Sequence, residues 1–123
     1  MWEQQVLFRQ MKLIKDIWVE GSVEAVQGKD TDLRWTSNIE EYAILREALC
    51  DEKKQEAYRK VINDVVEGVM HSMMVMFDGG SALSDEFSID VINSETGESL
   101  LSYSALHEEF IDYIIDAEEE EEK

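Results

Sequence analysis

The sequence predicts a small, helix-rich α+β domain. Apolar residues recur at helical spacing over much of the chain, which indicates amphipathic helices. No proline occurs in the 123 residues, so only glycine and capping residues can interrupt those helices. Between about residues 85 and 102 the apolar residues instead alternate with polar ones, as they do in strands. We therefore expect three to four helices packed with one β-hairpin and a C-terminal helix.

The chain length and composition predict one folded domain. A chain of 123 residues can bury roughly two-thirds of its unfolded surface around a single core. The apolar share of 44% is ordinary for a globular protein, so extensive disorder is not expected. We assign residues 1–117 to a single globular domain. Residues 118–123 are an acidic run, which we expect to form a frayed tail.

The first predicted helix spans residues 2–19. Its apolar residues share one broad arc of a helical wheel, while Arg9, Lys12 and Asp16 fall opposite. Gly21 and Gly28, together with the polar run "GKDTD", predict a connection after this helix. The intervening "SVEAVQ" could form a short helical turn within that connection.

The second predicted helix begins after Ser37, because Ser37 and Glu40 have the spacing of a capping box. Asp51 offers a further N-cap, so either two helices meet near Cys50 or one helix bends there. The long helix that follows should end at the glycine pair Gly79 and Gly80. Its predicted core face consists of Tyr58, Val61, Ile62, Val65, Val66, Val69, Met70, Met73, Met76 and Phe77.

The predicted hairpin and the last helix follow the glycine pair. Phe87, Ile89 and Val91 occupy alternate positions, and "NSETGES" predicts a turn before "LLSY". Since an isolated hairpin is marginally stable, it should pack on the helices or pair with a second copy of the chain. Ser104 is the expected N-cap of the C-terminal helix. One face of that helix carries Leu106, Phe110, Tyr113 and Ile114.

Negative charge is concentrated in the C-terminal part of the chain. The formal net charge is −18; residues 1–77 carry 14 acidic and 10 basic residues, whereas residues 78–123 carry 15 acidic residues and one basic residue. Such a field repels nucleic-acid phosphates and anionic lipids, and it attracts basic protein surfaces. We therefore predict no nucleic-acid partner and no membrane partner.

The sequence predicts a cytoplasmic protein. Cys50 is the only cysteine, so an intramolecular disulfide is impossible and a reducing compartment is the simpler assumption. Arg9, Lys12 and Lys15 interrupt the only N-terminal stretch that resembles a signal peptide. No run of residues approaches the length of apolar sequence that a membrane span requires.

Four residues are the candidates for a metal site. Glu67 and His71 are four apart on one helix, and Asp78 continues their line if the helix reaches it. His107 could join them from the last helix to give a cluster that suits zinc, iron or manganese, or an acid–base pair. The spacing matches neither the zincin motif nor the di-iron motif. A solvated helix face and a partly buried His107 are the favoured interpretation, so we predict no cofactor.

The run "FDGGS" does not fit other ligand loops. Its glycines follow a helix, where the macrodipole is negative, so a phosphate is disfavoured. The acids around it also lack the spacing of a calcium-binding EF-hand loop.

These patterns favour a non-catalytic interaction protein. A small acidic domain without a catalytic motif predicts a module or inhibitor, immunity-like, that binds a basic partner surface. The candidate contact residues are Trp35, Asp85, Glu86 and Asp90. A homodimer formed through the hairpin is compatible with this role. The alternative is a metal-binding protein or a hydrolytic enzyme that uses the His/carboxylate cluster.

Overall fold

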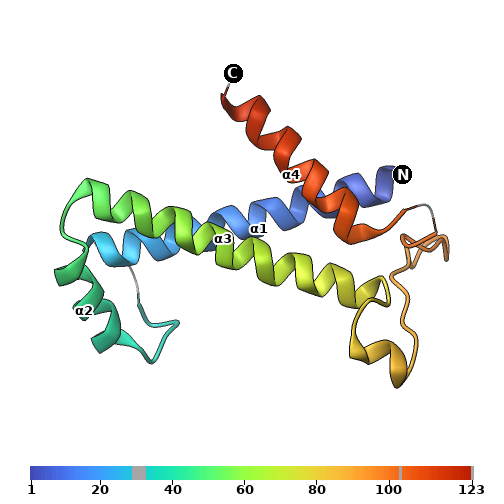
Figure 1. The fold of residues 1–123 in the computed structure, drawn as a ribbon, viewed down its shortest axis with the longest axis horizontal. Coiled ribbons are helices and arrows are strands. Elements are labelled where there is room, and N and C mark those ends of the chain that lie inside the picture. The colour runs from blue at the N-terminus through green and yellow to red at the C-terminus, as the bar shows by residue number, and fades with distance from the viewer. Residues whose placement is uncertain (29–32, 103, 123) are drawn as a thin grey trace. The chain divides into compact units, whose positions relative to one another are not determined.

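The computed structural model describes residues 1–28, 33–102 and 104–122, and this part of the chain is all-helical (Figure 1). Its α-helices are α1 (Trp2–Gln27), α2 (Ile39–Ala48), α3 (Glu52–Phe77) and α4 (Leu106–Glu122). A short 3-10 helix, η1 (Ala82–Asp85), lies between α3 and α4. The described residues form no β-strand, so the α+β prediction is wrong.

The predicted hairpin of residues 85–102 is reduced to one antiparallel bridge, between Ile92 and Ser99. Leu100 N donates to Val91 O at 2.7 Å, which closes the turn, but no ladder extends from it. The Asp90 carboxylate accepts hydrogen bonds from Ser99 Oγ at 2.5 Å and from the next backbone N–H at 2.8 Å. Such local side-chain bonds compete with strand pairing, and the exposed Phe87 adds no covered apolar face to favour a sheet.

Helix α1 is eight residues longer than predicted. Gly21 lies inside the helix, and "SVEAVQ" continues it because Val23, Ala25 and Val26 are buried on its inner side. The helix ends where Gly28 adopts φ 75°, a conformation that glycine accommodates without steric cost. Of the predicted connection, residues 29–32 lie outside the described part of the chain.

Two helices, rather than one bent helix, meet near Cys50. Asp51 caps α3 by accepting a hydrogen bond from Lys54 N at 2.9 Å, which confirms the predicted cap. The predicted capping box of Ser37 and Glu40 is wrong: the N-cap of α2 is Asn38, and its side chain makes no capping bond. Helix α3 ends at Phe77, immediately before the turn predicted at the glycine pair.

The chain divides into two compact units: unit 1 consists of Met1–Leu13 and Gly68–Lys123, and unit 2 of Ile14–Glu67. The core of unit 1 is aromatic. The Phe8 ring of α1 contacts the rings of Phe110 and Tyr113 on α4, with centroids 5.6 Å and 6.0 Å away. The buried members of this core are Phe8, Met74, Leu100, Leu106, Phe110 and Ile114.

Helix α4 continues to Glu122, so the segment expected to be a frayed tail is helical as far as that residue. Lys12 on α1 forms an ion pair with Glu121 at 2.6 Å, and only 9% of the lysine side chain is exposed. Because the lysine is largely shielded from water, its attraction to Glu121 is stronger than in an ion pair that is fully exposed. This contact holds the last turns of α4 within unit 1.

Unit 2 is built around a buried lysine. Lys15 of α1 exposes only 1% of its surface, and its Nζ donates to Asn63 Oδ1 and Glu67 Oε1 of α3, both at 3.0 Å. The ammonium group is thereby paired, as a buried charge must be. Arg46 of α2 donates from Nε to Ala25 O at 2.5 Å, so polar bonds connect α1 to both other helices of the unit.

Arg59 and Tyr58 of unit 2 both have pKa values above their ordinary ones. A hydrogen bond from Arg59 to Glu20 raises the pKa of the guanidinium, and Glu56 adds to the effect at 3.1 Å. Burial raises the pKa of Tyr58 above its ordinary value, and the neighbouring Tyr42 acts in the same direction. Arg59 therefore stays cationic and Tyr58 stays a neutral phenol across the physiological range.

The predicted core face of α3 is rotated from the observed one. Val61 and Val65 in unit 2, and Val69 and Met73 in unit 1, are all exposed. Met74, which lies outside that predicted face, is the buried residue of α3 in the described chain. A helix with apolar residues around most of its circumference does not specify which stripe meets the core. The exposed stripe is apolar surface without a partner in the described chain.

Replacing Lys15 tests the buried polar contact of unit 2. Lys15→Ala should lower the free energy of unfolding by about 2 kcal/mol, because Asn63 and the partly buried Glu67 lose their donor. Lys15→Met keeps the aliphatic packing and should cost less. The exposed Lys53→Ala is the matched control and should stay within about 0.5 kcal/mol. Urea denaturation measures all three; equal losses for Lys15→Ala and Lys53→Ala would contradict this role.

Candidate functional site

The candidate site lies where the end of α3 meets the start of α4, and Asp78 joins the two. Its carboxylate accepts hydrogen bonds from Leu106 N and His107 N, each at 2.9 Å. These are backbone donors of the first turn of α4, which have no partner within the helix itself. Asp78, rather than the predicted Ser104, therefore caps α4 from 28 residues earlier in the chain.

The glycine pair after Asp78 sets its position. Gly79 has φ 83°, and Gly80 N donates to Val75 O at 2.9 Å, so the chain turns tightly as α3 ends. A Cβ at Gly80 would lie 2.8 Å from Val75 Cγ1, which leaves no room for a side chain without a shift of Val75. The turn therefore fixes Asp78 at the last point of the helix, facing α4.

His107 is oriented by the same carboxylate. Its Nδ1 lies 2.6 Å from Asp78 Oδ2, and the Asp78 side chain is only 9% exposed. Because a carboxylate can only accept, His107 Nδ1 carries the hydrogen in this pair. Nε2 is the ring nitrogen that Asp78 leaves free of this bond, and Glu108 Oε1 lies 3.9 Å from it.

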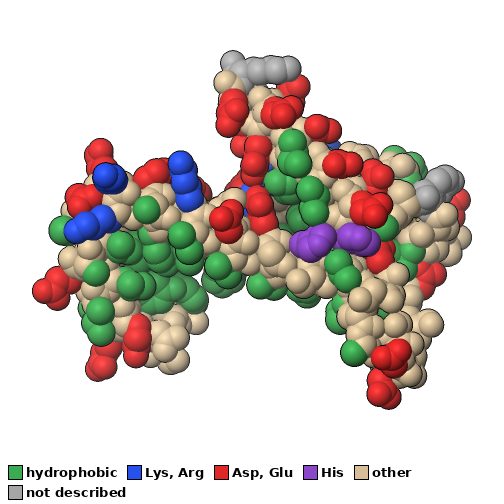
Figure 2. All heavy atoms as spheres, viewed as in Figure 1, with side chains coloured by type: hydrophobic (Ala, Val, Ile, Leu, Met, Phe, Trp, Pro, Cys, Tyr) green, Lys and Arg blue, Asp and Glu red, His purple; other side chains and the backbone are tan. Residues whose placement is uncertain are grey.

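His71 of α3 lies beside His107. The two ring centroids are 5.6 Å apart, with the planes at 75°, and Figure 2 shows the two histidines adjacent on one face of the molecule. His71 Nδ1 is buried and has no hydrogen-bond partner among the described residues. A buried, unsatisfied ring nitrogen is uncommon in folded proteins, because burial without a partner costs free energy. The His71 ring, which lies next to His107, therefore has one buried nitrogen without a hydrogen-bond partner in the described chain.

The structure brings three of the four candidate metal residues together: His71, Asp78 and His107. Glu67 is engaged separately in unit 2, where it accepts from Lys15 and from Asn63 Nδ2 at 3.1 Å. Within residues 1–28, 33–102 and 104–122, no three or more His, Cys, Asp or Glu side chains form a group that could hold a metal. In this structure Asp78 caps α4 and orients His107.

The candidate partner-binding residues are distributed over both units. In unit 2, Trp35 is 51% exposed and makes edge contacts with the rings of Trp18 at 5.4 Å and Tyr42 at 5.8 Å. In unit 1, Asp85, Glu86 and Asp90 are exposed along η1 and the chain after it. The aromatic anchor and the acids therefore belong to different units.

Sequence reasoning missed Gln4 as a positioning residue. Gln4 is buried in α1, and its Nε2 donates to Leu100 O at 2.5 Å and to Ser104 O at 3.2 Å. The amide thus holds the segment that leads into α4. A polar residue among the apolar residues of the first helix was the available signal, but its partners lie about a hundred residues further along the chain.

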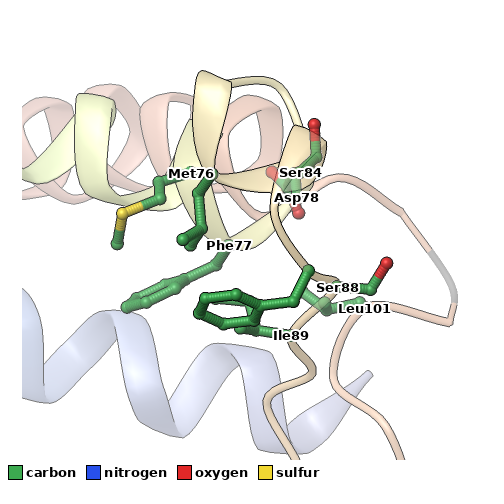
Figure 3. Close-up of a pocket in the computed structure, with 10 residues that line it drawn as sticks. Met76, Phe77, Asp78, Ser84, Ser88, Ile89 and Leu101 are labelled. Atoms are coloured by element: carbon green, nitrogen blue, oxygen red, sulfur yellow. The ribbon is translucent and has the colours of Figure 1, made fainter.

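A cavity of about 180 Å³ lies at the C-terminal end of α3 (Figure 3). Its walls come from the end of α3, from η1 and from the extended chain that follows. Its labelled lining residues are Met76, Phe77, Asp78, Ser84, Ser88, Ile89 and Leu101. Most of this lining is apolar, and Asp78 is already satisfied by α4, so the cavity is suited to a small apolar group.

Replacing Asp78 tests the long-range cap. Asp78→Ala should cost about 2–3 kcal/mol of unfolding free energy, since two helix N–H groups and the His107 ring lose their acceptor. Ser104→Ala should cost about 0.5 kcal/mol or less. The measurements are urea denaturation and the helical circular-dichroism signal. If Ser104→Ala were the more damaging change, the cap would be local after all.

Comparisons with known proteins add no functional information. A search found no family model, no curated protein and no solved structure that matches the chain. No helix in the described ranges combines the length and the low polarity needed to cross a lipid bilayer. The function must therefore be inferred from the chain's own charge, exposed surface and histidine pair.

Proposed function

We propose that this protein is a non-catalytic interaction module that binds a basic, amphipathic segment of another protein through unit 1. The observation that carries the proposal is the outer face of α4. There, exposed apolar side chains alternate with exposed carboxylates on a helix whose opposite face is already packed into the core.

The outer face of α4 has the pattern of a docking surface. Ile111 is 42% exposed and Ile115 is 50% exposed, and they lie one turn apart. Exposed acids flank them at Glu108, Asp112 and Asp116, and Figure 2 shows acidic and hydrophobic side chains intermingled over α4. A helix with apolar residues at i and i+4 and with flanking Lys or Arg would match both features.

The charge of unit 1 favours a basic occupant over a second copy. By sequence, unit 1 carries 16 acidic and three basic residues. One of those bases, Lys12, is paired with Glu121. Two copies of this surface would repel each other, whereas a basic segment would be drawn to it and would associate faster at low salt. The apolar pair would then supply contacts that slow dissociation.

An inhibitor that covers a basic surface of its target, as an immunity protein does, is the specific form of module that the charge supports. A cytoplasmic location is part of the proposal. Cys50 is exposed and free, which suits a reducing compartment.

The test uses a synthetic amphipathic helix of leucine and lysine as the probe. Fluorescence anisotropy should detect binding to the full chain, and affinity should fall about tenfold between about 20 mM and about 150 mM salt, because the contacts are largely ionic. The double variant Ile111→Ser/Ile115→Ser should weaken binding about tenfold while the salt dependence stays the same.

Two controls make the test specific. Ile44→Ser changes an exposed isoleucine of α2 in unit 2 and should leave the affinity unchanged. A peptide with glutamate in place of lysine should not bind. The proposal fails if binding is indifferent to salt, if the acidic peptide binds equally well, or if Ile44→Ser weakens binding as much as the α4 variant.

A further inference from the structure

We infer that His71 and His107 together form a binding site for one divalent transition-metal ion, with zinc as the reference ion and water completing the coordination. The site goes beyond the interaction surface, since neither histidine belongs to the outer pair of α4. It rests on three observations: the spacing of the rings, the orientation of His107 and the unpartnered nitrogen of His71.

The ring spacing fits two imidazoles that share one ion. A metal–nitrogen bond is about 2.0–2.1 Å long, so the ion lies about 3 Å from each ring centre, and two rings at a tetrahedral angle are about 5 Å apart. The centroids of His71 and His107 are 5.6 Å apart, and their planes are inclined at 75°. The distance between the two rings is therefore compatible with their binding the same ion.

Asp78 fixes the orientation of the His107 ring as a metal ligand would require. The bond between its Nδ1 and Asp78 Oδ2 at 2.6 Å fixes the tautomer and leaves Nε2 as the donor atom. A carboxylate that orients a ligating histidine in this way is typical of metal sites, where it also increases the basicity of the ligand. Asp78 is itself fixed by two backbone N–H groups, so His107 is preorganised.

The environment of His71 supports coordination. Its Nδ1 is buried and lacks a hydrogen-bond partner in the described chain, and a bound ion would supply one. The exposed carboxylate of Glu108 lies 3.9 Å from His107 Nε2. A negative group at that distance favours a cation.

The donor set narrows the choice of ion. Two imidazole ligands suit zinc, nickel, copper or iron, whereas magnesium and calcium prefer oxygen ligands. No third protein ligand from the described residues is in place. The site is therefore an open one, in which water or a ligand atom from another molecule occupies the remaining positions.

The experiment titrates the full chain with zinc chloride, using calorimetry and NMR of the histidine rings. The chain has two histidines, both in this site, so the ring signals report on nothing else. One zinc ion per chain should bind, and the signals of both rings should change together at one equivalent. Nickel should give the same pattern, and magnesium should leave the rings unchanged.

Variants separate this site from the acidic surface. His71→Gln and His107→Gln should each weaken zinc binding about 100-fold, and Asp78→Asn about 10–100-fold, because it removes the orienting carboxylate. The matched control is Glu119→Gln/Glu122→Gln, which changes exposed acids of α4 and should have no effect. Circular dichroism checks that each variant is folded.

The inference is overturned by either of two results. One is zinc binding that survives both histidine substitutions and is lost in the α4 control. The other is an NMR titration of the unmodified chain in which only one ring, or neither, responds. The second result needs no variant, so a failure of a variant to fold does not protect the inference.

Discussion

The bond network of the Asp78 carboxylate is the constraint on which unit 1 depends. A carboxylate that is nine-tenths buried must be fully hydrogen-bonded, since an unpaired buried charge is very costly. Its three donors all belong to the first residues of α4, namely two backbone N–H groups and one imidazole. The negative group also lies at the positive end of the α4 dipole. The start of α4 is thereby fixed to the end of α3.

Because the start of α4 is fixed, its rotation about its own axis is fixed too, and this determines which of its residues pack into the core. From Leu106 onward, every fourth residue, at Phe110 and Ile114, enters the core of unit 1. The tilted contact between the rings of Phe8 and Phe110 then places α4 beside α1. Ile111 and Ile115, one position further round, are left outside the core. The Asp78 cap thus positions the packed face of α4, its outer face and the histidine pair together.

The sequence predicts those features whose causes are local. The cap at Asp51 involves an N–H three residues away, and the end of α3 follows from two adjacent glycines, so both could be predicted. The α4 cap could not, because Asp78 and Leu106 are separated by 28 residues and Ser104 was the nearer candidate. The convergence of His71, Asp78 and His107 could be posed as a hypothesis, but Glu67 shows that helical spacing alone does not decide which partner a side chain finds.

Two of the wrong structural predictions, the hairpin and the core face of α3, share a cause. A pattern of apolar residues does not determine which surface will pack against them. Alternation at Phe87, Ile89 and Val91 resembles a strand, but the described chain forms only one bridge there. Val91 packs against the helical core while Phe87 stays exposed. In α3 the apolar residues surround most of the axis, and packing selected the stripe that contains Met74.

The exposed apolar residues along α3 affect how the protein behaves in solution. Val61, Val65, Val69 and Met73 would promote self-association on hydrophobic grounds. The net charge of −18 opposes it at neutral pH. Near the isoelectric point of about 4.2 that repulsion disappears. The colloidal stability of the molecule therefore depends on the same carboxylates that define its surface, and acidification removes the barrier to precipitation.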